Sequence, residues 1–176
     1  MEKREDRRVT MTKRLLKDAL IELLREHSIY QISIRELCQR ADVNRTTFYK
    51  YYGSQFDLLS DMENDIIAFV DSTVAKNEAS PERIIEALCD FLEDNLEFAR
   101  LIITNNIDST FPQKLFSSEV LRGIVCKNYG QYDAAEMEYL YNFITGGAFR
   151  MLCIWLNKTE REPPEKLARL IVQMAT

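Results

Sequence analysis

Residues 33–52, SIRELCQRADVNRTTFYKYY, predict a short helix, a tight turn and a second short helix. Ser33 and Glu36 have the spacing of a capping box, in which each side chain satisfies a backbone N–H at the start of a helix. Asp42 and Asn44 favour a turn, and Asn44 is also a good N-cap for the second helix. The first helix has one apolar face at helical spacing, formed by Ile34, Leu37, Cys38 and Ala41.

The second helix, residues 45–52, has an apolar side with Phe48 and Tyr52 and a side of residue types that bind nucleic acid. A helix fits the major groove, where Arg, Lys and Thr reach base edges or phosphates and Tyr hydroxyls bind phosphate. The pattern favours a helix-turn-helix that places its second helix in the groove. A helical hairpin whose tyrosines only pack is the alternative. The residues on the polar side are Arg45, Thr46, Thr47, Tyr49, Lys50 and Tyr51.

The same stretch resembles the TetR/AcrR family of bacterial transcriptional regulators. The resemblance rests on residues 46–54, TTFYKYYGS, which follow ADVNR and precede Asp57-Leu58-Leu59, and it covers residues 9–59. Asp42 stands where the family usually has Gly, and Gln55 where it usually has a phosphate-binding Lys. Together with the residue pattern, the resemblance implies DNA contacts at Ser33, Arg35, Asn44, Arg45, Thr46, Thr47, Tyr49, Lys50 and Tyr51.

The composition favours an ordered, all-α protein. Hydrophobic residues make up 46% of the 176 residues, and there are only five glycines and four prolines. We expect a three-helix DNA-binding domain over residues 1–53 and a helical dimerisation and effector domain over residues 54–176. No signal peptide or membrane span is expected, so the prediction is a cytoplasmic protein without a membrane partner.

The charge distribution agrees with a DNA-binding head. Residues 1–52 hold twelve Lys or Arg against eight Asp or Glu, whereas residues 53–176 hold eleven against twenty. The net charges of +4 and −9 would draw the head to phosphate and repel the body. Residues 2–8 are charged without an apolar face and predict a mobile arm, with the first long helix beginning at Thr10 or Thr12.

The second domain is predicted to contain helices over about residues 54–76, 81–92, 96–105, 112–127, 133–157 and 164–175. The helix over 133–157 is apolar on much of its circumference and must be buried on several sides. Gly146 and Gly147 inside it cost about 1 kcal/mol each relative to Ala, so either a close helix contact or a ligand must offset them. We favour a two-fold dimer interface, which the resemblance also implies, formed by Gly146, Gly147, Met151, Trp155, Leu167, Leu170, Ile171 and Met174.

The resemblance also implies an apolar pocket for a small effector in the second domain, although aromatic residues at helical spacing are more often plain core. The candidates for its lining are Phe91, Phe98, Phe111, Phe116, Tyr139, Phe143 and Arg150. No cofactor, metal site or catalytic constellation is expected, since the one His has no nucleophile at a recognisable spacing. The predicted function is a dimeric regulator, by default a repressor, that binds a palindromic operator in double-stranded DNA. The alternative is a co-regulator or adaptor dimer that acts through a partner protein.

Overall fold

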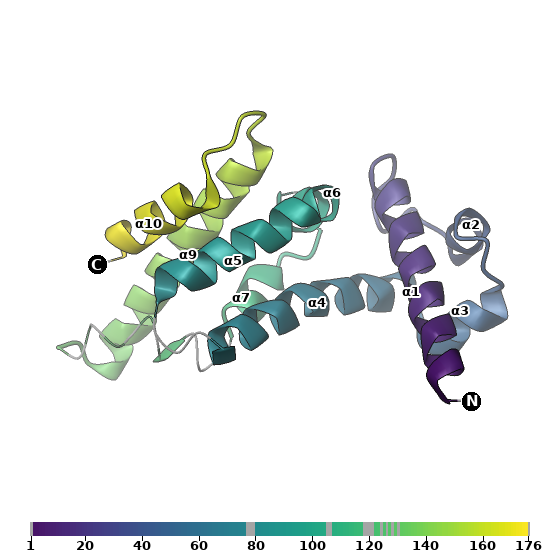
Figure 1. The fold of residues 1–176 in the computed structure, drawn as a ribbon, viewed down its shortest axis with the longest axis horizontal. Coiled ribbons are helices and arrows are strands. Elements are labelled where there is room, and N and C mark those ends of the chain that lie inside the picture. The colour runs from purple at the N-terminus through teal and green to yellow at the C-terminus, as the bar shows by residue number, and fades with distance from the viewer. Residues whose placement is uncertain are drawn as a thin grey trace. The chain divides into compact units, whose positions relative to one another are not determined.

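The computed structural model describes residues 2–76, 80–104, 107–117, 122–123, 125, 127, 129 and 131–175, and every regular element within them is a helix (Figure 1). The predicted all-α fold is confirmed. Packing divides the chain into two compact units, residues 1–65 and 66–176. None of the described helices is long and apolar enough to cross a membrane.

The first unit contains α1 (Glu2–Leu24), α2 (Ile34–Arg40), α3 (Arg45–Tyr51) and the first turns of α4 (Gln55–Lys76). Helix α1 packs on α2, and α2 packs on α3 (Figure 1). The apolar faces predicted for these helices are buried, which confirms a three-helix head. Its core consists of Leu16, Ala19, Leu20, Leu23, Leu24, Ile29, Ile32, Leu37, Cys38, Ala41, Phe48, Tyr52, Leu58, Leu59 and Met62.

The N-terminal arm predicted for residues 2–8 is wrong, because α1 begins at Glu2. The hydroxyl of Thr12 donates to the carbonyl of Arg8 at 2.9 Å, so this Thr lies inside the helix instead of capping it. Glu, Lys and Arg have good helix propensity, and they continue the helix without needing an apolar face.

The second unit contains the rest of α4, α5 (Pro81–Asp94), α6 (Leu96–Ala99), the π-helical turn η1 (Arg100–Thr104), α7 (Phe111–Leu115), α9 (Ala134–Asn157) and α10 (Pro164–Met174). Helix α10 packs along α5 (Figure 1). The prediction of a single helix over 112–127 is wrong, because α7 already ends at Leu115. The amide of Phe116, its C-cap residue, donates to the carbonyl of Pro112.

Helix α9 is fixed at both ends. At its start, Asp133 Oδ1 accepts from the amide of Glu136 at 2.9 Å, while Glu136 Oε2 accepts from the amide of Asp133 at 2.9 Å. At its end, Arg100 Nε donates to the carbonyl of Leu156 at 2.7 Å, which satisfies one of the last carbonyls of the helix. Hydrogen bonds at both ends therefore hold α9 in place, and with it the side chains on its surface.

Candidate nucleic-acid interface

The turn between α2 and α3 is a Schellman motif with Asp42 in the left-handed region, at a φ of 52°. The amide of Val43 donates to the carbonyl of Cys38 at 2.9 Å, and the amide of Asp42 donates to the carbonyl of Gln39 at 3.4 Å. Asn44 then caps α3, since its Oδ1 accepts from the amide of Thr46 at 2.9 Å. The turn reverses the chain within three residues and starts α3 immediately.

Helix α3 has one anchored side and one exposed side. Phe48 is fully buried, and its ring meets the ring of Tyr49 edge-on at 5.6 Å between centroids. Tyr49 itself is 58% exposed, so its hydroxyl is available to a ligand. The rest of the predicted contact set on this helix and its cap is exposed at Asn44, Arg45, Thr46 and Lys50 and half-buried at Thr47 and Tyr51.

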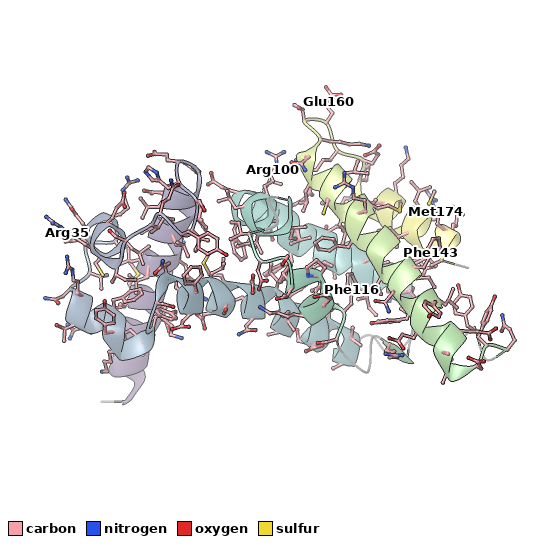
Figure 2. The ribbon with its side chains drawn as sticks, turned by 180° about the vertical axis from the view of Figure 1, so that it is seen from behind. Arg35, Arg100, Phe116, Phe143, Glu160 and Met174 are labelled. Carbon is pink, nitrogen blue, oxygen red and sulfur yellow. The ribbon has the colours of Figure 1, made fainter. Side chains whose placement is uncertain are left out.

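The cations on and near α3 differ from Arg40 at the end of α2. Arg40 is paired with Glu22 at 3.0 Å between Nη1 and Oε2. Among the described residues, in contrast, no carboxylate lies within 4.0 Å of Arg35, Arg45 or Lys50. Arg35 projects from α2 into solvent (Figure 2). In the part of the chain that the structure describes, these three positive charges have no carboxylate partner, as expected for side chains that bind phosphate or base edges.

Two polar residues at the edge of this surface have partners inside the unit. Ser33 Oγ accepts from the amide of Glu36 at 3.2 Å, which confirms half of the capping box, while the Glu36 carboxylate lies 3.9 Å from His27 Nε2. Gln55 Nε2 donates to the carbonyl of Ile29 at 3.4 Å. Gln55 is therefore used to hold the loop after α1.

A polar cluster of α1, α4 and the C-cap of α3 was not predicted. The Tyr52 hydroxyl donates to Asp61 Oδ2 at 2.9 Å, and Lys17 Nζ lies 2.8 Å from the same oxygen and 2.6 Å from Asp65 Oδ2. Burial, and then the bond to Asp61, raises the pKa of Tyr52. Burial alone would raise the pKa of Asp61, but the hydrogen bonds from Lys17 and Tyr52 hold it below its ordinary value. The pairs Lys13–Lys17 and Asp61–Asp65, each four residues apart on a helix, were the signal available in the sequence.

The described residues leave one face of α9 uncovered. Tyr139 is 79% exposed, Phe143 75% and Ile154 51%, and they follow one another at helical spacing. A Cβ added to Gly146 or Gly147, which lie on the same face, would meet nothing within 4 Å. Figure 2 shows Phe143 on α9 and Met174 on α10. Packing among the described residues therefore does not account for the two glycines.

The predicted interface residues of α9 and α10 lie in two layers. Met174 is 70% exposed, while Met151 and Leu170 are half-buried and line a surface groove with Ile154. Trp155, Leu167 and Ile171 are buried within the chain. The outer layer and the glycines can contact a second molecule, whereas the inner layer supports them.

A cavity of about 130 Å³ lies inside the second unit. Of the predicted effector-pocket residues, Phe116 lines it and the other six do not. Phe111 is core, Phe91 stacks on Phe69 at 4.2 Å between ring centroids, and Phe98 is half-buried. Tyr139, Phe143 and Arg150 are exposed on α9. The cavity lining comprises Val70, Pro81, Ile84, Ile85, Leu88, Leu115, Phe116, Val125, Tyr129, Ile144, Thr145, Ala148, Leu152, Ile171, Val172 and Ala175.

The aliphatic lining of the cavity was missed because these residues look like ordinary core in the sequence. Elsewhere in the described residues, no group of three His, Cys, Asp or Glu side chains could hold a metal ion. The described cysteines, Cys38, Cys89 and Cys153, are free and buried, and burial raises the pKa of Cys89 to about 12. Cys126 lies outside the described residues.

The fold and the exposed face of α3 define a helix-turn-helix protein of the DNA-binding class. Residues 16–62 match the model of the bacterial regulatory proteins of the tetR family, and residues 79–176 match a model described as a transcriptional regulator C-terminal region. The chain belongs to the TetR family of transcriptional regulators.

Similar proteins agree with this membership. The uncharacterised HTH-type transcriptional regulator YxbF of Bacillus subtilis is 26% identical over 92% of this chain and 44% of its own length. The dhaKLM operon transcriptional activator DhaS of Lactococcus lactis is 28% identical over 57% of this chain and 52% of its own length. The chain thus spans about half the length of these curated relatives. A TetR regulator structure from Streptococcus agalactiae shares the fold with a TM-score of 0.75 at 22% identity, covering 99% of both chains.

Proposed function

We propose that this regulator binds a palindromic DNA operator as a homodimer, represses transcription by occupying the site, and is released by a small apolar effector. The observation that carries DNA binding is the exposed surface of α2 and α3, on which Arg35, Arg45 and Lys50 lack a carboxylate partner among the described residues. Ser33, Asn44, Thr46, Thr47, Tyr49 and Tyr51 are the polar residues proposed to complete the contact surface.

DNA binding is tested by single Arg45→Ala and Lys50→Ala variants. The affinity for a duplex is measured by fluorescence anisotropy at several salt concentrations. Each variant should reduce the slope of log affinity against log salt by about 1, because one phosphate contact is lost. Arg83→Ala on α5 is the matched control, because this exposed Arg lies in the other unit. Unchanged slopes for both α3 variants would favour the adaptor function instead.

A second copy of the chain is the proposed partner for the exposed face of α9. Apolar side chains at this exposure, next to two glycines that no described residue approaches, suit a two-fold helix contact. A dimer would present two α3 helices to half-sites about 34–36 Å apart, which accounts for a palindromic operator. In this proposal Tyr139, Phe143 and Arg150 belong to the interface and not to the effector pocket.

The cavity of the second unit is the proposed effector site. Its lining contains no charged side chain, and the hydroxyl of Thr145 is already used to donate to the carbonyl of Tyr141 at 2.7 Å. A volume of about 130 Å³ suits a neutral apolar molecule of roughly benzene size. Val70 of α4 lines the cavity, and α4 continues to the head, so a shift of α4 would be passed along this helix.

The effector site is tested by Ala148→Leu, which places three more carbons in the cavity. Thermal unfolding is followed with and without benzene or toluene as the probe. The wild type should be stabilised by the hydrocarbon, while the variant should unfold at a higher temperature without the probe and respond less to it. An equal response of both proteins would place the hydrocarbon site elsewhere.

We propose repression and not activation, because a protein that occupies a promoter needs no further activity to repress transcription. DhaS of Lactococcus lactis is named an activator, so a promoter fusion that reports both directions is the appropriate measurement. If the chain acts as an adaptor, expression from the fusion should be the same with the Lys50→Ala variant as with the wild type.

A further inference from the structure

The C-terminal end of α3 is tied to α4 by one hydrogen bond. Tyr52 is the C-cap residue of α3, its side chain is 5% exposed, and its hydroxyl donates to Asp61 Oδ2 at 2.9 Å. Its ring contacts the Phe48 ring at 5.8 Å between centroids. A phenylalanine could make the same ring contact, so packing alone does not explain the hydroxyl.

Asp61 is in turn held in place by α1. Lys17 Nζ lies 2.8 Å from the oxygen that accepts the Tyr52 bond, and Lys13 Nζ lies 3.6 Å from the other oxygen. Lys17 is also bound to Asp65 at 2.6 Å, one turn further along α4. The Lys13 ammonium group lies 5.4 Å from the centroid of the Tyr52 ring. Three helices therefore converge on one carboxylate.

This arrangement matters because α3 is only seven residues long. Its start is fixed by the turn at Asp42 and the Asn44 cap, whereas its end has the buried rings of Phe48 and Tyr52 and the bond to Asp61. Ring packing permits small rotations and shifts, but a hydrogen bond to a fixed carboxylate is directional. The angle at which α3 presents Tyr49 and Lys50 thus depends on Asp61.

We propose that Asp61 is a positioning residue of the DNA interface, which acts through the Tyr52 hydroxyl to set the direction of α3. It contacts neither base nor phosphate in this role. The proposal rests on the proposed DNA-binding function for its consequence, but the restraint on α3 is a property of the protein alone.

The first test is Tyr52→Phe, which removes one hydroxyl and keeps the ring. We expect DNA affinity at fixed salt to fall about tenfold, with the slope of log affinity against log salt unchanged because no phosphate contact is removed. Tyr30→Phe is the matched control, since Tyr30 is 78% exposed, and it should leave affinity unchanged. Measurements are made well below the unfolding temperature of each variant. A variant with a lower unfolding temperature but unchanged affinity would reduce the hydroxyl to a structural role and overturn the proposal.

The second test asks whether Asp61 acts through Tyr52. In an Asp61→Ala background, the further change Tyr52→Phe should no longer reduce DNA affinity, because the bond is already absent. The charge change caused by Asp61→Ala cancels in this comparison. Additive losses in the double variant would show that the two residues act independently.

A third readout separates this proposal from DNA binding itself. Amide hydrogen exchange over residues 48–52, measured without DNA, should be faster in Tyr52→Phe than in Tyr30→Phe and the wild type. If the wild type binds no DNA but the exchange increases, the proposed function fails while the restraint on α3 stands. If exchange is unchanged, the restraint is wrong whatever the DNA result.

Discussion

Asp42 adopts a left-handed backbone conformation that most residues with a side chain avoid. The sequence pattern of the family has Gly here, and Asp is among the few other residues that tolerate the region. Asp42→Gly should stabilise the protein by up to about 1 kcal/mol, whereas Asp42→Val should destabilise it by about 1–3 kcal/mol. Urea unfolding of the two variants measures both changes. Equal stability of the Val and Gly variants would mean that the turn does not require a positive φ.

Gln55 is half-buried and bound to the carbonyl of Ile29, at the position where the family pattern has a phosphate-binding Lys. Gln55→Lys should add one phosphate contact, so DNA affinity should rise and the salt slope should steepen by about 1. The control is Gln113→Lys, which adds the same charge at an exposed position of α7. A comparable gain from the control would attribute the effect to net charge and exclude a contact at residue 55.

At the scale of the element, α9 gives the sharpest prediction. Because no described residue lies within 4 Å of a Cβ added at Gly146 or Gly147, Ala at either position should stabilise the isolated chain by about 1 kcal/mol through helix propensity. If a partner helix approaches there, the same methyl group should weaken association of two chains. Sedimentation equilibrium measures association, and unfolding at low protein concentration measures stability. Variants that are more stable and associate as tightly as the wild type would exclude these glycines from the interface.

The helices were largely predictable from the sequence, because caps and apolar periodicity are local. Ser33 and Asn44 each cap a helix as expected. The helix predicted from residue 133 is capped by Asp133, although this cap was not predicted. The start of α1 was not predictable in this way, because charged residues without an apolar face suggested an arm. The faces of α9 were ambiguous for the opposite reason: apolar residues on most sides do not reveal which side a second molecule covers.

The exposed side of α3 and the cavity of the second unit also differ in how far local sequence patterns could predict them. The exposed side of α3 could be predicted because consecutive residues of one short helix form it, and Phe48 is the buried residue of that helix. The cavity could not be predicted, since its lining comes from residues such as Ile84, Leu115 and Leu152 on helices far apart in the sequence. Aromatic size suggested Tyr139 and Phe143 for the pocket, but the structure places them on the surface.

At the scale of the whole molecule, the charge boundary and the packing boundary fall at different points of the chain. Residues 1–52 carry a net charge of +4 and residues 53–176 a net charge of −9. Residues 53–65 hold four acidic residues and no Lys or Arg, so the packed unit of residues 1–65 has a net charge of 0. The boundary between the packed units lies within α4, after Asp65, so Asp61 and Asp65 belong to the first unit and neutralise Lys17 there. Arg35, Arg45 and Lys50, which have no carboxylate within 4.0 Å among the described residues, place positive charge on α2 and α3, where it can attract DNA to the helix-turn-helix.

We propose above all that the chain binds DNA as a symmetric dimer. Selection of bound duplexes from a random pool by the purified protein tests this proposal most directly. A symmetric dimer should enrich a palindrome whose half-site centres are about 10 bp or a small multiple apart, and recovery should decrease steeply as salt increases. Lys50→Ala should lose the enrichment, while Arg83→Ala should retain it. A pool that stays unenriched at low salt would contradict direct DNA reading, and enrichment of a lone half-site would contradict the dimer.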